Sequence, residues 1–154
     1  MTPAIDVAKK NKIVHKVHQY LHEPASESYG LEAAEKMGVP EGQVFKTLVV
    51  RLNTKELVVG VVPVSSMLSM KLIARAAGAK KAEMAPQSEV ERSTGHVLGG
   101  VSPLGQKKSL KTIIDSSAIN HSTIYVSAGR RGLEIELSPN DLKRLVRGTF
   151  EDIC

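Results

Sequence analysis

Two apolar segments in the middle of the chain predict a buried β-hairpin. Residues 44–52 and 56–63 consist largely of Val and Leu, and the turn residues Asn53 and Thr54 lie between them. Short runs of β-branched residues between turn signals are typical of strands. Because these runs are apolar at successive positions, we expect both faces of the hairpin to be buried.

Shorter apolar segments and helix-capping residues predict the remaining elements. Further strands are expected over residues 14–21, 81–84, 110–114, 123–127 and 133–137. Helices are expected over residues 3–11, 31–37, 70–77, 86–94 and 139–146. Thr2 and Ser138 each precede a proline at an expected helix start, and Gly38 follows an expected helix end. A hydroxyl at the N-cap accepts a backbone hydrogen bond, and glycine adopts the left-handed conformation that ends many helices.

The length and composition indicate a single globular domain over residues 1–154. A chain of 154 residues is typical of one domain and buries about 68–70% of its unfolded surface. Aromatic residues make up only 3% of the chain, so the core must consist of Val, Leu, Ile, Ala and Met. The mixture of strands and short helices predicts a mixed α/β fold.

The glycine-rich segment Gly99-Gly100-Val101-Ser102-Pro103-Leu104-Gly105 carries the strongest motif of the chain. Glycine permits positive φ and the close approach of a ligand, and proline keeps the residue before it extended. Such a loop can direct several backbone N–H groups at one oxygen, as in an anion nest or an oxyanion hole. The alternative is an ordinary glycine-rich turn.

The charge balance favours a polyanionic partner. The chain carries 21 Lys and Arg against 16 Asp and Glu, a net charge of +5. Several basic pairs, among them Lys107-Lys108 and Arg130-Arg131, flank the glycine-rich segments. A basic surface suits RNA, although a solvated basic protein without such a partner has the same charge balance.

The cysteine content and the hydropathy exclude other classes of protein. The one cysteine, Cys154, permits neither a disulfide framework nor a cysteine-based metal site. The histidines lack Asp, Glu or Cys at metal-ligand spacings, so we expect no metal and no cofactor. No apolar stretch reaches the length of about 18 residues that a membrane span needs, and the N-terminus lacks the apolar core of a signal peptide. We therefore expect a cytoplasmic protein without membrane contact.

Read with several other short motifs, the glycine-rich segment resembles the YbaK/EbsC family. The resemblance covers nearly the whole chain and rests on Met1–Ala4, Tyr20, Val44–Leu48, Ser93–Gly95, Gly99–Lys108 and Tyr125–Ser127. The family consists of small free-standing deacylases that hydrolyse mischarged tRNA and are related to the editing domain of bacterial prolyl-tRNA synthetases. The resemblance implies a curved, largely antiparallel sheet that forms a pseudo-barrel with short peripheral helices.

The resemblance also implies which residues form the site. It implies catalytic roles for Lys46, Gly99, Gly100, Val101 and Ser102. It implies substrate contacts for Tyr20, Tyr29, Pro103, Gly105 and Glu134. The most similar type, the Cys-tRNA(Pro) deacylases, commonly has Phe at the position of Tyr29 and often Asp at that of Glu134. The extra hydroxyl of Tyr29 bears on the amino acid that the site accepts, and Glu134 is longer than Asp by one methylene.

The residue pattern alone leaves several of these roles open. Lys46 lies among apolar residues at a strand start, where it would hold a phosphate or an ester oxygen, or extend into solvent. Tyr20 and Tyr29 flank a polar loop and would stack on the terminal adenine or anchor that loop on the core. Glu134 and Glu136 share one strand face, so either could bind the substrate amine, or either could be solvated.

The resemblance implies a trans-editing deacylase that removes cysteine from Cys-tRNA(Pro) or Cys-tRNA(Cys). No Ser–His or Cys–His arrangement is visible and no base pairs with Ser102, so the substrate thiol is the expected nucleophile, as in the family. The expected partners are the acceptor end of aminoacyl-tRNA and, as a candidate, prolyl-tRNA synthetase. The alternatives are a deacylase for another amino acid, such as alanine, or a non-catalytic module that binds tRNA or a synthetase.

Overall fold

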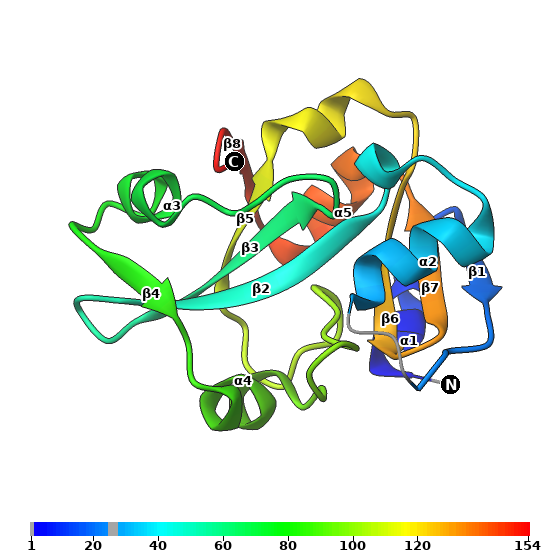
Figure 1. The fold of residues 1–154 in the computed structure, drawn as a ribbon, viewed down its shortest axis with the longest axis horizontal. Helices are drawn as coiled ribbons and strands as arrows, with labels where there is room; N and C mark the ends of the chain where they lie inside the picture. The colour runs from blue at the N-terminus through cyan, green and yellow to red at the C-terminus, as the bar shows by residue number, and fades with distance from the viewer. Residues whose placement is uncertain (1, 25–27) are drawn as a thin grey trace.

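The computed structural model describes residues 2–24 and 28–154. Its helices are α1 (Pro3–Lys10), α2 (Tyr29–Met37), α3 (Met70–Ala76), α4 (Gln87–Thr94) and α5 (Pro139–Val146), with short 3-10 helices at Glu41–Gln43 and Ser116–Asn120. Its strands are β1 (His15–Gln19), β2 (Phe45–Leu52), β3 (Leu57–Pro63), β4 (Ala82–Met84), β5 (Lys111–Asp115), β6 (Ile124–Arg130), β7 (Leu133–Leu137) and β8 (Thr149–Glu151). Figure 1 shows their arrangement.

Hydroxyl side chains cap the N-termini of α1, α3 and α5. The hydroxyls of Thr2, Ser69 and Ser138 accept hydrogen bonds from the N–H groups of Ile5, Leu72 and Asp141 at 3.3, 3.1 and 3.1 Å, respectively. Gly38 follows α2 in the left-handed conformation, as predicted. Helix α2 begins at Tyr29, earlier than the predicted start at Leu31, so Tyr29 lies on its first turn.

The strands form two sheets, which confirms the expected mixed α/β class with largely antiparallel pairing. The sheets have the orders β1-β7-β6 and β4-β2-β3-β5-β8. Strand β5 departs from the antiparallel pattern because it pairs in parallel with both β3 and β8. A parallel bridge between Val44 and Tyr125 connects the two sheets. The sheets are curved but do not close, so the predicted pseudo-barrel is open.

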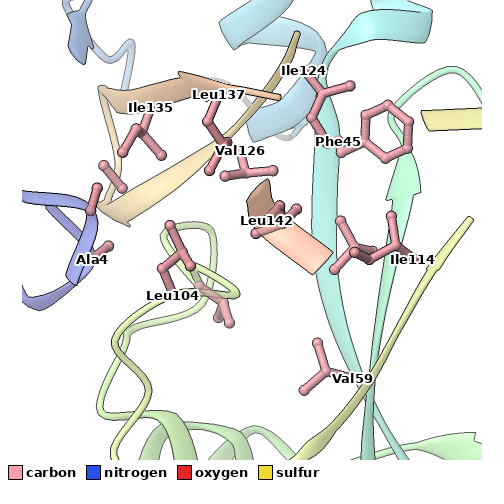
Figure 2. Packing of buried hydrophobic residues seen from close by; sticks show 14 of the residues in the cluster. Ala4, Phe45, Val59, Leu104, Ile114, Ile124, Val126, Ile135, Leu137 and Leu142 are labelled. Atoms are coloured by element: carbon pink, nitrogen blue, oxygen red, sulfur yellow. The ribbon is translucent and has the colours of Figure 1, made fainter. Parts of the chain in front are cut away.

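The main hydrophobic core lies between the two sheets. It contains Phe45 and Ile114 from one sheet, Ile124 and Ile135 from the other, and Leu142 from α5, all at most 2% exposed. Figure 2 shows Leu142 among the side chains of both sheets. Burying a side chain of this size contributes about 1.5–3 kcal/mol relative to leaving it exposed.

The opposite face of the β2–β3 hairpin is also buried, as its continuous apolar pattern predicted. Val50, Val58 and Val62 pack there with Ile73 of α3 and with Ile153 near the C-terminus. Strand β8, which leads into Ile153, was not predicted. Its short sequence Thr-Phe-Glu has no apolar pattern, and it forms a strand through its pairing with β5.

Candidate active site

A cavity of about 310 Å³ lies where α2, the start of β2, strands β6 and β7 and the glycine-rich loop meet. This volume is at the lower end of the range for small-molecule sites, about 300–1,000 Å³. The cavity brings together six of the predicted site residues: Tyr20, Tyr29, Lys46, Gly99, Val101 and Glu134. Its other lining residues are Ser28, Gly30, Ala33, Val44, Phe45, Thr47, Leu48, Leu98 and Ser127.

Lys46 and Thr47 line the cavity from the first half of β2. Strand β4 pairs with β2 only further along, from Val50 to Leu52, so the start of β2 borders the cavity instead. Lys46 is half-buried. Thr47 is 9% exposed, and its hydroxyl has no hydrogen-bond partner within residues 2–24 and 28–154. Thr47 was not predicted as a site residue. Its signal in the sequence is a hydroxyl between the apolar residues Phe45 and Val49, which share its strand face.

Glu134 lies in the cavity wall, whereas Glu136 belongs to a separate hydrogen-bond network. Glu134 is 6% exposed, and its burial raises the pKa of its carboxyl to about 8. Glu136 is hydrogen-bonded to the His18 imidazole at 2.9 Å and to the Thr123 hydroxyl at 2.6 Å. Burial raises the pKa of Glu136, but the hydrogen bonds from Thr123 and His18 outweigh burial and lower it. Of the two carboxyls that the sequence left open, Glu134 is therefore the one available to a ligand.

Tyr20 and Tyr29 both line the cavity, but different groups surround their side chains. The Tyr29 ring lies 5.5 Å from the His22 ring and 4.3 Å from the guanidinium carbon of Arg131. The His22 imidazole is in turn 2.7 Å from the Glu32 carboxylate of α2. Burial, and then the charge of Glu134, raise the pKa of Tyr20 to about 12. The Tyr20 hydroxyl therefore keeps its proton at neutral pH and can donate a hydrogen bond.

Gly99 and Gly100 occupy positions that admit no side chain. Gly99 has a φ of +88°, and a Cβ there would lie 2.5 Å from the Tyr29 ring and 2.7 Å from Nε of Arg131. A Cβ on Gly100 would lie 2.8 Å from the Arg130 Cα. The loop thus packs directly against α2 and against the turn between β6 and β7.

Two backbone donors of this loop are available to a ligand. Gly100 N–H donates to the Val97 carbonyl at 3.0 Å, and Ser102 N–H donates to the His96 Nδ1 at 3.2 Å. The N–H groups of Gly99 and Val101 have no acceptor within the two described stretches of the chain. Both residues line the cavity. Backbone N–H groups in a cavity wall are the donors from which oxyanion and phosphate sites are built.

Ser102, Pro103 and Gly105 lie away from this cavity. Ser102 is fully buried, and its hydroxyl accepts a hydrogen bond from Leu104 N–H at 3.1 Å. Pro103 and Gly105 line a different hollow, between the loop and α5. A Cβ on Gly105 would lie 2.6 Å from the carbonyl carbon of Pro3, so this glycine packs against the start of α1. The observed contacts of these residues maintain the shape of the loop.

Cys154 does not lie in the cavity wall. Burial, together with the charge of Asp115 and a hydrogen bond to it, raises the pKa of its thiol to about 11. Within residues 2–24 and 28–154, no cluster of His, Cys, Asp and Glu could hold a metal ion. Within the same residues, no helix has the length and apolar character to cross a bilayer.

Comparison with known sequences points to one family. The family model for the aminoacyl-tRNA editing domain matches residues 22–145. An Enterococcus faecalis protein named "Putative Cys-tRNA(Pro)/Cys-tRNA(Cys) deacylase EbsC" is 37% identical over 153 residues, which cover 99% of this chain and 92% of that protein. The Bacillus subtilis protein "Uncharacterized protein YwhH" is 30% identical over 80% of this chain and 78% of its own length.

Solved structures share the fold. A structure described as "a putative trans-editing enzyme for prolyl tRNA synthetase" has a TM-score of 0.82 and 24% identity, and the match covers 97% of this chain and 91% of that chain. The structure of the hypothetical protein APE2540 has a TM-score of 0.85, also at 24% identity, and covers 98% of both chains. At these identities the likeness shows the fold alone.

Proposed function

Because this chain belongs to the family of aminoacyl-tRNA editing domains, we propose that it is a trans-editing deacylase that removes cysteine from mischarged Cys-tRNA(Pro). The family membership and the deacylase name of the Enterococcus relative support aminoacyl-tRNA deacylation as the reaction class. The choice of cysteine as the amino acid is supported by that relative's name and is the part that the experiment below addresses.

The observation that carries the proposed mechanism is the chemical composition of the cavity wall. The wall contains a lysine, free backbone donors and a carboxyl, and no histidine is among the lining residues of the described chain. Within the described residues, the hydroxyls of Thr47 and Ser127 therefore have no imidazole base beside them in the wall. An aminoacyl ester is already activated, so positioning and oxyanion stabilisation can supply much of the rate. A cysteine substrate brings its own nucleophile.

In the proposed reaction the thiol of the bound cysteine attacks its own ester carbonyl. The S–C bond forms, the C–O bond to the terminal ribose breaks, and the thiol proton passes to the ribose oxygen. Free tRNA leaves, and water then opens the cyclic thiolactone to cysteine. The N–H groups of Gly99 and Val101 stabilise the charge on the ester oxygen. Lys46 holds either that oxygen or the terminal phosphate, and Glu134 binds the substrate amine.

A deacylation panel with Cys-, Ser-, Ala- and Pro-tRNA(Pro) tests the substrate and the nucleophile together. We expect rapid loss of cysteine with a transient thiolactone, and little loss of serine, because a hydroxyl is a far weaker nucleophile near neutral pH. A preference for Ala-tRNA(Pro) would instead indicate an alanine deacylase. Binding of tRNA with the ester left intact would indicate a non-catalytic module.

Two variants separate the substrate thiol from nucleophiles of the protein. Ser102→Ala and Cys154→Ala should each keep substantial activity, because the Ser102 hydroxyl is engaged within the loop and Cys154 keeps its proton. A thermal unfolding midpoint close to that of the wild type verifies that each variant is folded. Rapid hydrolysis of Ser-tRNA(Pro), or a cysteinyl-enzyme trapped by mass spectrometry, would contradict the mechanism. Glu134 would then be the candidate base for an activated water.

The proposed partner is the acceptor end of aminoacyl-tRNA, with prolyl-tRNA synthetase as a second candidate. Lys46 lines the cavity. The exposed side chains of Arg130, at the end of β6, and of Arg131, in the turn that follows, lie beside the glycine-rich loop. Positive charge around a small cavity suits the phosphates that precede the aminoacyl ester.

A further inference from the structure

Arg131 is not part of the cavity wall, but it contacts two residues that are. Its side chain comes from the turn between β6 and β7. Nε and Nη2 of Arg131 both donate to the Leu98 carbonyl oxygen, at 3.1 and 2.6 Å. The same guanidinium stacks on the Tyr29 ring at 4.3 Å. One exposed side chain therefore connects the glycine-rich loop to α2.

The contact with Leu98 orients the peptide group that carries the Gly99 N–H. In a planar trans peptide, the C=O of one residue and the N–H of the next point in opposite directions. Two hydrogen bonds from a cation hold the Leu98 oxygen toward Arg131, and the Gly99 N–H therefore points away from Arg131. A cation at the carbonyl also polarises the peptide and strengthens its N–H as a donor. Gly99 lines the cavity, and its N–H has no acceptor within residues 2–24 and 28–154.

Steric contacts reinforce this arrangement. The Gly99 Cα packs so closely against Tyr29 and Arg131 that a Cβ would lie 2.5 Å from the ring and 2.7 Å from Nε. Tyr29 is supported by the His22 ring at 5.5 Å, and His22 by the Glu32 carboxylate at 2.7 Å. The Gly99 peptide and the Tyr29 ring therefore share a common support, and a shift of Arg131 would release both.

We propose that Arg131 is a positioning residue that sets the Gly99 N–H and the Tyr29 ring in the geometry required to bind the ester oxygen of the substrate. Its role in catalysis rests on the proposed deacylase function. Lysine cannot replace it, because an ammonium is a point charge without the planar fork that donates twice to one carbonyl while stacking on a ring.

The experiment compares Arg131→Lys with two control variants. Arg130→Gln removes the neighbouring charge and leaves the Leu98 contact in place. Arg75→Lys makes the same conservative change on the exposed last turn of α3. The measurements are kcat and KM for Cys-tRNA(Pro) at low and moderate salt, and the Gly99 amide resonance in a ¹⁵N–¹H spectrum of the unligated protein. The remaining resonances report whether each variant keeps the fold.

For Arg131→Lys we expect kcat to fall by up to about 10²-fold at both salt concentrations, because a misplaced donor costs a rate factor of this size. KM should change little, and the Gly99 resonance should move. Arg130→Gln should raise KM alone, and higher salt should reduce this difference. Arg75→Lys should match the wild type. If Arg131 merely contacts phosphate, Arg131→Lys will keep the wild-type kcat and behave like Arg130→Gln, which overturns the inference.

The ¹⁵N–¹H spectrum tests the role of Arg131 independently of the proposed deacylase function, because it needs no substrate. If the wild-type protein deacylates no aminoacyl-tRNA, the proposed function fails, and the Gly99 resonance still tests the contact. A Gly99 resonance that stays unchanged in folded Arg131→Lys overturns the positioning role, whatever the activity.

Discussion

At the residue scale, the cavity presents polar groups that have no hydrogen-bond partner within the described parts of the chain. They include the Thr47 hydroxyl and the backbone donors of Gly99 and Val101, and Glu134 is buried beside them. A buried polar group without a hydrogen bond costs about 1–3 kcal/mol. The buried Thr47 hydroxyl therefore reduces stability, and a polar ligand in the cavity would satisfy it.

Lys46 is the side chain whose loss should most affect catalysis. Lys46→Ala should fold, because Lys46 is half-buried at the start of β2, and it should lose most Cys-tRNA(Pro) deacylation. Removing one stabiliser of an oxyanion lowers the rate by about 10²–10³-fold. Single-turnover deacylation measures the loss, with Lys71→Ala on the exposed face of α3 as the control. Wild-type turnover in a folded Lys46→Ala protein would exclude Lys46 from the mechanism.

Glu134 should make the stability depend on pH. Its folded pKa of about 8 lies above the ordinary value of 4.5, so folding favours the protonated carboxyl. The folded protein then binds more protons than the unfolded chain, and the wild type loses stability as the pH rises from about 4.5 to about 8. Glu134→Gln removes the ionisation and should be more stable than the wild type, but only in the upper part of this range. Urea unfolding at about pH 5 and about pH 8.5 measures this difference.

Glu136→Gln is the matched control for this measurement. Glu136 lies on the same strand, but its pKa is lowered in the folded protein, so its ionised form stabilises the fold. Its contribution is present above the ordinary pKa and is lost as the pH falls through the folded pKa. Glu136→Gln should therefore not reproduce the gain at high pH. An equal free energy of unfolding for Glu134→Gln and the wild type at high pH would show that Glu134 is not desolvated.

At the element scale, the site depends on loops that pack against helices. The glycine-rich loop contacts α2 through Gly99, the β6–β7 turn through Gly100 and the start of α1 through Gly105. Each contact is made by a residue without a side chain, so the backbones approach closely. These three backbone contacts fix the position of the loop, which is not part of either sheet.

Gly105→Ala should be considerably more destabilising than Gly78→Ala. Both glycines have positive φ, +69° and +75°, so both substitutions incur a left-handed strain of about 1–2 kcal/mol. A Cβ on Gly78 meets nothing within 4 Å, whereas one on Gly105 would lie 2.6 Å from the Pro3 carbonyl carbon. Overpacking adds about 1–3 kcal/mol. Equal shifts in the free energy of unfolding would show that the loop does not rest on α1.

At the scale of the whole molecule, the net charge of +5 should attract the phosphates of tRNA and so strengthen binding at low salt. We expect the binding of uncharged tRNA(Pro) to weaken with salt, the log–log slope steepening by about 0.7–0.9 for each phosphate neutralised. Fluorescence anisotropy at several salt concentrations measures the slope. Arg130→Gln should lower it by about the contribution of one phosphate. An affinity that does not change between low and moderate salt would contradict an interface formed mainly with phosphates.

The sequence by itself determined the local elements and the family. The caps at Thr2 and Ser138 and the continuous apolar run of the β2–β3 hairpin depend on neighbouring residues, so the sequence alone predicts them. The glycine-rich motif is recognisable in the sequence because positive φ values and close backbone contacts restrict its glycine positions to that residue. The sequence and its family resemblance indicate six residues that line the cavity: Lys46, Tyr20, Tyr29, Gly99, Val101 and Glu134.

Only the tertiary structure decided which of these residues share a cavity. Glu134 and Glu136 are equivalent in a strand pattern, and they differ because His18 and Thr123 pair with Glu136 alone. Ser102 lies within the motif but is buried away from the cavity, whereas Thr47 and Arg131 lie outside the motif and contact the site. Strand β8 likewise exists through its partner β5. The contacts that decide Glu136, Arg131 and β8 join residues far apart in the chain, which no local pattern of residues encodes.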